Sequence, residues 1–177
     1  MQKDMKTKRI AIDGIMAALY VILGYISIDM GMMKISFEDL PVILAGLMMG
    51  PIDGMIVGGL GTFIFQMLRY GFSATTLLWM LPYIVCGLIC GLFAKQNNYY
   101  NTNRQLWLII MVAGLATFSL NTFAIYVDSK VYGYYSPAYV WGALGVRFLI
   151  MAAKTVIFGL LTMPILKAMA KITGRKK

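Results

Sequence analysis

Long apolar runs separated by short polar segments dominate this chain. The runs cover residues 10–28, 37–50, 55–70, 76–94, 105–127 and 140–169. Because a helix needs about 20 apolar residues to cross a bilayer, the pattern predicts an all-α integral membrane protein with six transmembrane helices. The second run is shorter than the usual ~17–25 residues, so we expect it to cross only if it is tilted or extends into the preceding loop.

The composition agrees with a membrane protein and leaves no room for a soluble catalytic domain. Hydrophobic residues make up 60% of the chain, charged residues make up 13%, and the mean hydropathy is +0.75. A soluble domain of this size could not cover so much apolar surface. We therefore expect one six-helix membrane domain over residues 1–177, with a basic segment at 1–9 and a basic tail at 170–177.

The positive charge of the chain indicates its orientation in the membrane. The net charge is +9, and most Lys and Arg fall on the side of the predicted bundle that carries both termini. Lys34, Arg69 and Lys130 lie on the opposite side. The excess of basic residues in cytoplasmic segments predicts cytoplasmic N- and C-termini in a multi-pass protein of the bacterial plasma membrane. Basic clusters at the ends of an apolar chain are typical of contacts with anionic lipid, not with nucleic acid.

Two cations lie inside the last apolar run. Arg147 and Lys154 are seven residues apart, so they project from one helical face, and residues 140–164 contain no Asp or Glu. An unpaired charge at this depth costs several kcal/mol, which predicts an anionic ligand or a water-filled cavity. Arg69 ends the third run on the same outer side, so we expect three cations to converge on a carboxylate or phosphate. The alternative is that Lys154 snorkels or pairs with a carbonyl and that Arg69 is interfacial.

Aromatic and amide side chains complete the predicted pocket. Trp79 and Tyr83 are one helical turn apart and share a face, as stacking partners for a planar ring would. Trp and Tyr also gather at membrane interfaces without any ligand, and polar side chains also bond between helices. The remaining predicted pocket residues are Phe65, Gln66, Asn121, Thr122 and Trp141.

The sequence lacks the residues that several kinds of chemistry require. The chain contains no His, and Cys86 and Cys90 are one turn apart in an apolar run, which favours core packing over a metal site. No Gly-Lys-Ser or Gly-Lys-Thr phosphate loop is present. Asp13, Glu38 and Asp53 fall only at the ends of runs, so no proton relay is visible. We predict no metal, no cofactor and no enzyme activity, and we expect separate partners to supply the energy for any transport.

Several segments carry a resemblance to a known family. Residues 34–41 read KISFEDLP and lead through Leu-Ala-Gly to Gly50-Pro51, residues 75–79 read TTLLW, and residues 87–92 read GLICGL. Leu-Asn-Thr at 120–122 and the pattern from Arg147 to Pro164 follow. Together these segments resemble the substrate-binding S components of energy-coupling factor (ECF) vitamin transporters, particularly the folate family.

The resemblance implies an architecture and a set of partners. S components have six helices and an outward-facing pocket roofed by the first loop, where Lys34 lies and is included among the predicted substrate-binding residues. They dock onto a transmembrane coupling protein that is driven by two cytoplasmic ATPase subunits. In the family the docking face consists of small residues of the first helix, and here Gly14 and Ala18 match that spacing.

The charges then favour one vitamin among several. Folate carries two carboxylates and a planar pterin, which match the cations and the aromatic residues, so folate is the first choice. Pantothenate has one carboxylate and no ring, hydroxymethylpyrimidine leaves the cations unexplained, and cationic thiamine would be repelled. Two other classes remain as alternatives: a small membrane enzyme acting on lipid head groups, for which no catalytic group is visible, and a structural assembly subunit, which would not need Arg147 and Lys154.

Overall fold

The computed structural model describes residues 2–29, 34–99 and 102–172, and six α-helices account for most of them. The helices are α1 (Gln2–Tyr25), α2 (Asp39–Met49), α3 (Pro51–Arg69), α4 (Thr76–Gln96), α5 (Asn103–Val131) and α6 (Leu144–Ile172). A short antiparallel pair of strands, β1 (Ile28–Asp29) and β2 (Lys34–Ile35), separates α1 from α2. A π-helical turn, η1 (Ala138–Gly142), precedes α6. The predicted all-α class and the number of helices are confirmed.

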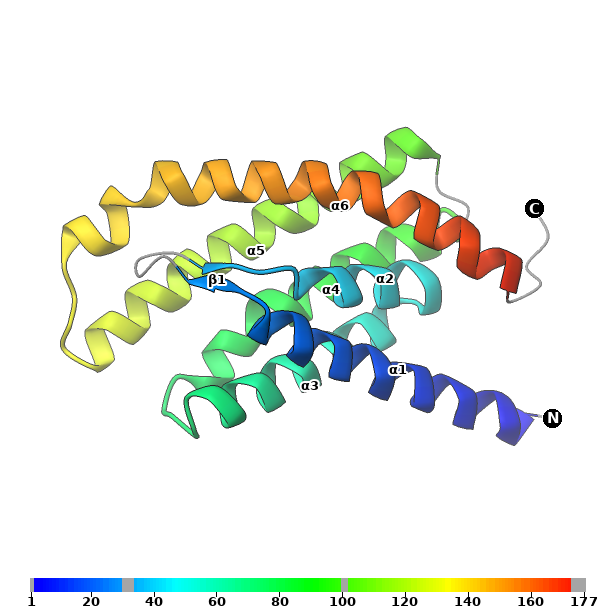
Figure 1. The fold of residues 1–177 in the computed structure, drawn as a ribbon, viewed down its shortest axis with the longest axis horizontal. Coiled ribbons are helices and arrows are strands. Elements are labelled where there is room, and N and C mark those ends of the chain that lie inside the picture. Colours follow the sequence, from blue (N-terminus) through cyan, green and yellow to red (C-terminus); the bar gives the residue numbers. More distant parts are fainter. Residues whose placement is uncertain (1, 30–33, 100–101, 173–177) are drawn as a thin grey trace.

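The two ends of α1 differ from the prediction. The helix already begins at Gln2, so most of the basic segment 1–9 belongs to it, and it ends at Tyr25 because Ile28 pairs with Ile35 in the two-stranded hairpin. The first turn of α1 and the last turn of α6 lie at the same end of the bundle (Figure 1). We call the opposite end, where α5 ends and η1 lies, the distal end. Most of the basic tail 170–177 falls outside the described residues.

The short helix α2 lies at the centre of the bundle. It has 11 residues, eight of them buried, and it packs against α1, α3, α4 and α6 (Figure 1). At about 1.5 Å per residue its axis is roughly 16 Å long, about half the hydrocarbon thickness. The helix does not extend into the preceding loop, because β2 occupies that segment. Apolar helices of this length are typically buried core helices, and α2 is one.

Four longer helices form the outer part of the bundle. By length and composition, the segments Pro51–Arg69, Thr76–Gln96, Asn103–Val131 and Ala138–Ala168 can each cross a membrane, and these four are the ones found among the described residues. Large apolar side chains on these helices point outward, as with Leu149 and Leu160, which are 66% and 64% exposed. In a bilayer these side chains contact lipid tails, so their exposure costs nothing.

Glycines allow α3 and α4 to approach each other closely. A Cβ atom built on Gly87 of α4 would lie 2.2 Å from the backbone carbonyl carbon and oxygen of Gly54 in α3. A Cβ on Gly58 would lie 2.4 Å from the carbonyl oxygen of Tyr83. The small-residue spacings in these two helices therefore serve internal packing, as expected, because only Gly lets the two backbones meet at this distance.

An ion pair joins α1 to the junction of α2 and α3. The guanidinium of Arg9 pairs with the carboxylate of Asp53, which lies in the first turn of α3 and is buried. The same guanidinium donates to the carbonyl oxygen of Met49, the last residue of α2, at 2.7 Å. One side chain of α1 thus fixes the turn between the next two helices, at the end of the bundle that carries the termini.

The contact between α3 and α4 yields a stability prediction. Replacing Gly87 by Ala should destabilise the protein by about 1–3 kcal/mol, because the added methyl group has no room and must push the helices apart. The matched control is Gly145→Ala in α6, where a Cβ meets nothing within 4 Å, and we expect no loss there since Ala favours helix over Gly. Thermal unfolding in detergent, followed by circular dichroism, measures both. Equal melting temperatures for the two variants would contradict the packing described here.

Candidate functional site

A cavity of about 560 Å³ lies inside the bundle and takes its walls from all six helices. Its volume is in the range of small-molecule sites, which are typically about 300–1,000 Å³. Aromatic and polar side chains make up most of the lining, and seven residues predicted from the sequence are among them. These seven are Phe65, Gln66, Trp79, Tyr83, Asn121, Arg147 and Lys154. The buried Thr122 lines it as well.

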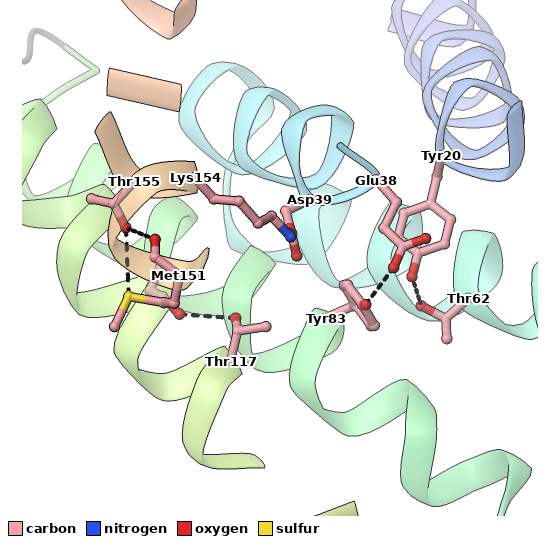
Figure 2. Close-up of polar contacts among 10 residues, drawn as sticks. Tyr20, Glu38, Asp39, Thr62, Tyr83, Thr117, Met151, Lys154 and Thr155 are labelled. Carbon is pink, nitrogen blue, oxygen red and sulfur yellow. Dashed lines mark hydrogen bonds and ion pairs between the residues drawn. The ribbon is translucent and has the colours of Figure 1, made fainter. Parts of the chain in front are cut away.

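A buried polar cluster connects α1, α3, α4 and the start of α2 at one wall of the cavity. Tyr83 donates a hydrogen bond to the carboxylate of Glu38 at 2.6 Å, and the hydroxyls of Thr62 and Tyr20 lie 2.9 Å apart (Figure 2). The rings of Tyr20 and Tyr83 also meet edge to face, with centroids 5.2 Å apart. This wall therefore offers a carboxylate and hydroxyl groups whose positions are fixed by one another.

Lys154 is not the unpaired cation that the sequence suggested. Its ammonium group forms an ion pair with the carboxylate of Asp39, in the first turn of α2 (Figure 2). The interpretation of Lys154 as a cation without a partner in the chain is therefore wrong, although Lys154 does line the cavity. The compensating charge is that of Asp39, which lies on another helix and 115 positions away in the sequence. Residues 140–164 alone therefore give no sign of it. The pair fixes the central helix α2 to α6 beside the cavity.

Arg147 uses backbone oxygen atoms as its partners. Its guanidinium donates to the carbonyl oxygens of Tyr139 at 3.0 Å and Val140 at 3.4 Å, and it lies 5.7 Å from the centroid of the Tyr139 ring. Both carbonyls belong to η1, the π-helical turn that precedes α6. Arg147 thus carries a positive charge at the cavity wall but already binds acceptors of the chain.

Arg69 and Trp141, two further predicted site residues, are not among the described residues that line the cavity. Arg69 stacks over the rings of Phe65 and Tyr70, at 5.8 and 5.5 Å from their centroids, so the expected convergence of three cations is not observed. Trp141 is half exposed, and its indole lies 3.4 Å from the hydroxyl of Tyr135. Lys34 lies in β2, and its side chain is outside the described part of the structure.

A carboxylate missed by sequence reasoning lies at the distal end of the cavity. The fifth apolar run ends at residue 127, but α5 continues to Val131, so Asp128 belongs to the last turn of this helix. It accepts hydrogen bonds from Thr75, from Trp79 at 3.3 Å and from Tyr134. Burial and the bond to Asp128 raise the pKa of the Tyr134 phenol, which therefore stays a donor. The spacing of Asn121 and Asp128, seven residues apart, could have placed both on one helical face.

Charged side chains of both signs line the cavity. Three carboxylates (Glu38, Asp39 and Asp128) and two cations (Arg147 and Lys154) line the cavity. Among the described residues, no group of three or more His, Cys, Asp or Glu is placed to hold a metal ion. The cavity thus offers hydrogen-bond acceptors, aromatic faces and hydroxyl groups, a set suited to binding rather than to nucleophilic or metal-assisted catalysis.

Comparison with known proteins identifies the family. The family model described as "ECF-type riboflavin transporter, S component" matches residues 4–171. The chain belongs to this family. It is therefore a non-catalytic, multi-pass subunit of the cell membrane that serves vitamin uptake together with a coupling subunit and ATPase subunits. The resemblance to S components seen in the sequence is confirmed at this level.

Individual relatives agree with that assignment. A UPF0397 protein of Lactobacillus johnsonii is 32% identical over 133 residues, which cover 64% of this chain and 71% of the relative. The crystal structure of FolT bound with folic acid superposes with a TM-score of 0.71 at 22% identity, covering 90% of this chain and 97% of that one. A biotin S component from an ECF-type transporter gives 0.74 at 17% identity, covering 97% and 95%. At these identities the two structures show the S-component fold and nothing finer.

The ion pair between α2 and α6 generates a prediction. In Lys154→Met the carboxylate of Asp39 stays buried without its cation, so we expect a loss of about 3–5 kcal/mol in stability. The double variant Lys154→Met/Asp39→Asn removes both charges and should recover much of that loss. Thermal unfolding in detergent compares the two with Lys130→Met, an exposed control. A single variant as stable as wild type, or a double variant less stable than the single one, would refute the role of this pair.

Proposed function

We propose that this S component binds an uncharged, planar, polar heterocyclic vitamin in the central cavity, with riboflavin as the first candidate. The observation that carries the proposal is that both cations of the cavity already have partners within the chain. Lys154 is neutralised by Asp39, and Arg147 already donates to two carbonyl oxygens. Since the cations are accounted for, an acidic ligand is no longer required, and the family description names riboflavin.

The lining chemistry supports a neutral ring system. Riboflavin has three fused flat rings with imide and ring-nitrogen groups, and a chain of hydroxyl groups. Trp79, Tyr83 and Phe65 supply aromatic surface for such rings. Gln66 and Asn121 supply amides that both donate and accept hydrogen bonds, as the edge of the ring system requires. Carboxylates in the same lining favour hydroxyl and N–H donors and disfavour a ligand carboxylate nearby.

Folate is the second candidate, and one observation favours it. Arg147 lines the cavity with its guanidinium directed at carbonyl oxygens of η1. A ligand carboxylate that replaced one of these carbonyls would gain a charge-assisted, two-point hydrogen bond. The choice between riboflavin and folate therefore depends on whether Arg147 keeps its backbone partners when the ligand is bound.

Direct titration tests the proposal. We expect purified protein in detergent, without ATP, to bind riboflavin more tightly than folate, pantothenate, thiamine or hydroxymethylpyrimidine, as measured by isothermal titration calorimetry. Arg147→Ala should change riboflavin affinity by less than about tenfold, because no charge-assisted bond to the ligand is lost. If folate binds and Arg147→Ala weakens it about 10- to 100-fold while Lys130→Ala does not, folate is the substrate. Binding of pantothenate alone would contradict both candidates.

The exposed face of α1 provides the expected docking prediction. Gly14 and Ala18 both lie exposed on that helix, and a Cβ on Gly14 meets nothing within 4 Å. Gly14→Leu should therefore leave folding and vitamin binding intact but block assembly with the coupling and ATPase subunits, because a close helix contact there admits no large side chain. Co-purification of the complex measures this, with Gly145→Leu as the control at an equally open glycine. Normal assembly of the Gly14→Leu variant would show that the docking face does not include this part of α1.

A further inference from the structure

Three donors from two segments of the chain converge on Asp128 at the distal end of the cavity. The hydroxyl of Thr75, directly before α4, and the indole N–H of Trp79, one turn into α4, both donate to Oδ1. The hydroxyl of Tyr134, which follows α5, donates to Oδ2. All four residues line the cavity. Asp128 therefore connects the start of α4 to the end of α5 and to the segment that leads toward η1.

The carboxylate is suited to this position because it only accepts hydrogen bonds. An ionised carboxylate has two oxygens with about four lone-pair sites, whereas an amide side chain has one accepting oxygen. The indole N–H of Trp79 is a donor without any acceptor capacity, so a half-buried indole needs an acceptor at a fixed place. The bond of 3.3 Å to Oδ1 supplies that acceptor and thereby fixes the rotation of the ring at the cavity wall.

A second bond joins the same two segments. The backbone N–H of Ala74 donates to the hydroxyl of Tyr132 at 3.2 Å. The segment before α4 is thus fixed to the segment after α5 at two points, through Asp128 and through Tyr132. Both points lie at the distal end, where Tyr132 and Tyr134 are exposed and also line the cavity. The indole of Trp79 is therefore positioned by groups that also form the distal wall of the cavity.

We propose that Asp128 is a positioning residue for vitamin binding: it holds the indole of Trp79 in the orientation that stacks on the ligand ring. This inference rests on the proposed function, namely that the vitamin occupies this cavity. Asp128 acts through Trp79 and not by direct charge attraction. The consequence is that its effect on affinity depends on the presence of the indole and on an accepting oxygen, but not on the negative charge itself.

The experiment compares two substitutions of Asp128 with a matched control on the same helix. Asp128→Leu removes both accepting oxygens, while Asp128→Asn keeps one and removes the charge. Ser119→Ala is the control, because Ser119 is exposed on α5, bonds only to the carbonyl of Leu115 and does not line the cavity. With riboflavin as the probe, we expect Asp128→Leu to weaken binding at least about tenfold, Asp128→Asn to recover most of the loss, and Ser119→Ala to have no effect.

A double-mutant cycle with Trp79→Phe separates positioning from a general structural role. If Asp128 acts through the indole, Asp128→Leu should weaken binding by less than about twofold once Trp79 is Phe. Independent losses that multiply in the double variant would overturn the inference, as would wild-type affinity in Asp128→Leu. If Asp128→Leu does not fold, Tyr134→Phe and Thr75→Val in the same cycle each remove one bond to the carboxylate. Absence of vitamin binding by wild type overturns the proposed function, whereas wild-type binding with an unaffected Asp128→Leu overturns this inference alone.

Discussion

Charged and polar side chains inside a bilayer need partners within the protein. In this chain the ion pair between Asp39 and Lys154 meets that requirement most directly. An unpaired cation at that depth would cost several kcal/mol. The pair joins the central helix α2 to α6 and places both charges at the wall of the cavity. The cavity is therefore polar, yet its central cation is compensated before any ligand enters.

The central position of α2 explains how such a cavity can exist in a small bundle. Because α2 is too short to cross the membrane, its start lies inside the bundle, where Glu38 just before the helix and Asp39 in its first turn line the cavity. Glycines such as Gly54 and Gly87 bring α3 and α4 into close contact on one side. Larger residues, including Trp79 and Tyr83, line the remaining space. The helices therefore pack closely on one side of the bundle, while aromatic side chains form the wall of the cavity on the other.

Much of the fold followed from local patterns, and the departures have physical reasons. The apolar runs predicted the helices, because helix formation in a membrane depends on local composition. The same runs could not show that α2 is buried, since burial depends on neighbours. Trp79 and Tyr83 were predicted because they share one helical face, and Asn121 because its amide can hydrogen-bond a heterocycle. Arg69 was expected at the cavity because interfacial and pocket arginines look alike in sequence, and its stacking on Phe65 and Tyr70 emerges only in three dimensions.

Charge pairing was the least predictable feature of the site. Asp39 is at a helix start, where an acid also satisfies the helix dipole, so its contact with Lys154 left no local signal. Asp128 was not recognised as a site residue because the apolar run ends at residue 127, whereas α5 continues to Val131. The missed pairing with Asp39 left Lys154 without a partner, and that gap pointed toward an acidic ligand. In the structure Lys154 already has a partner, and the proposed preference for a neutral heterocycle depends on this pairing.

The molecule retained by the purified protein tests this account most directly. Protein isolated in mild detergent from cells grown in rich medium can be denatured and its released ligand identified by liquid chromatography and mass spectrometry, with the Asp128→Leu variant as a low-binding comparison. The account predicts an uncharged ring compound, with riboflavin first, present in near-equal molar amount to the protein. Folate or another carboxylate-bearing vitamin in that amount would contradict the proposal that the cavity takes an uncharged ligand.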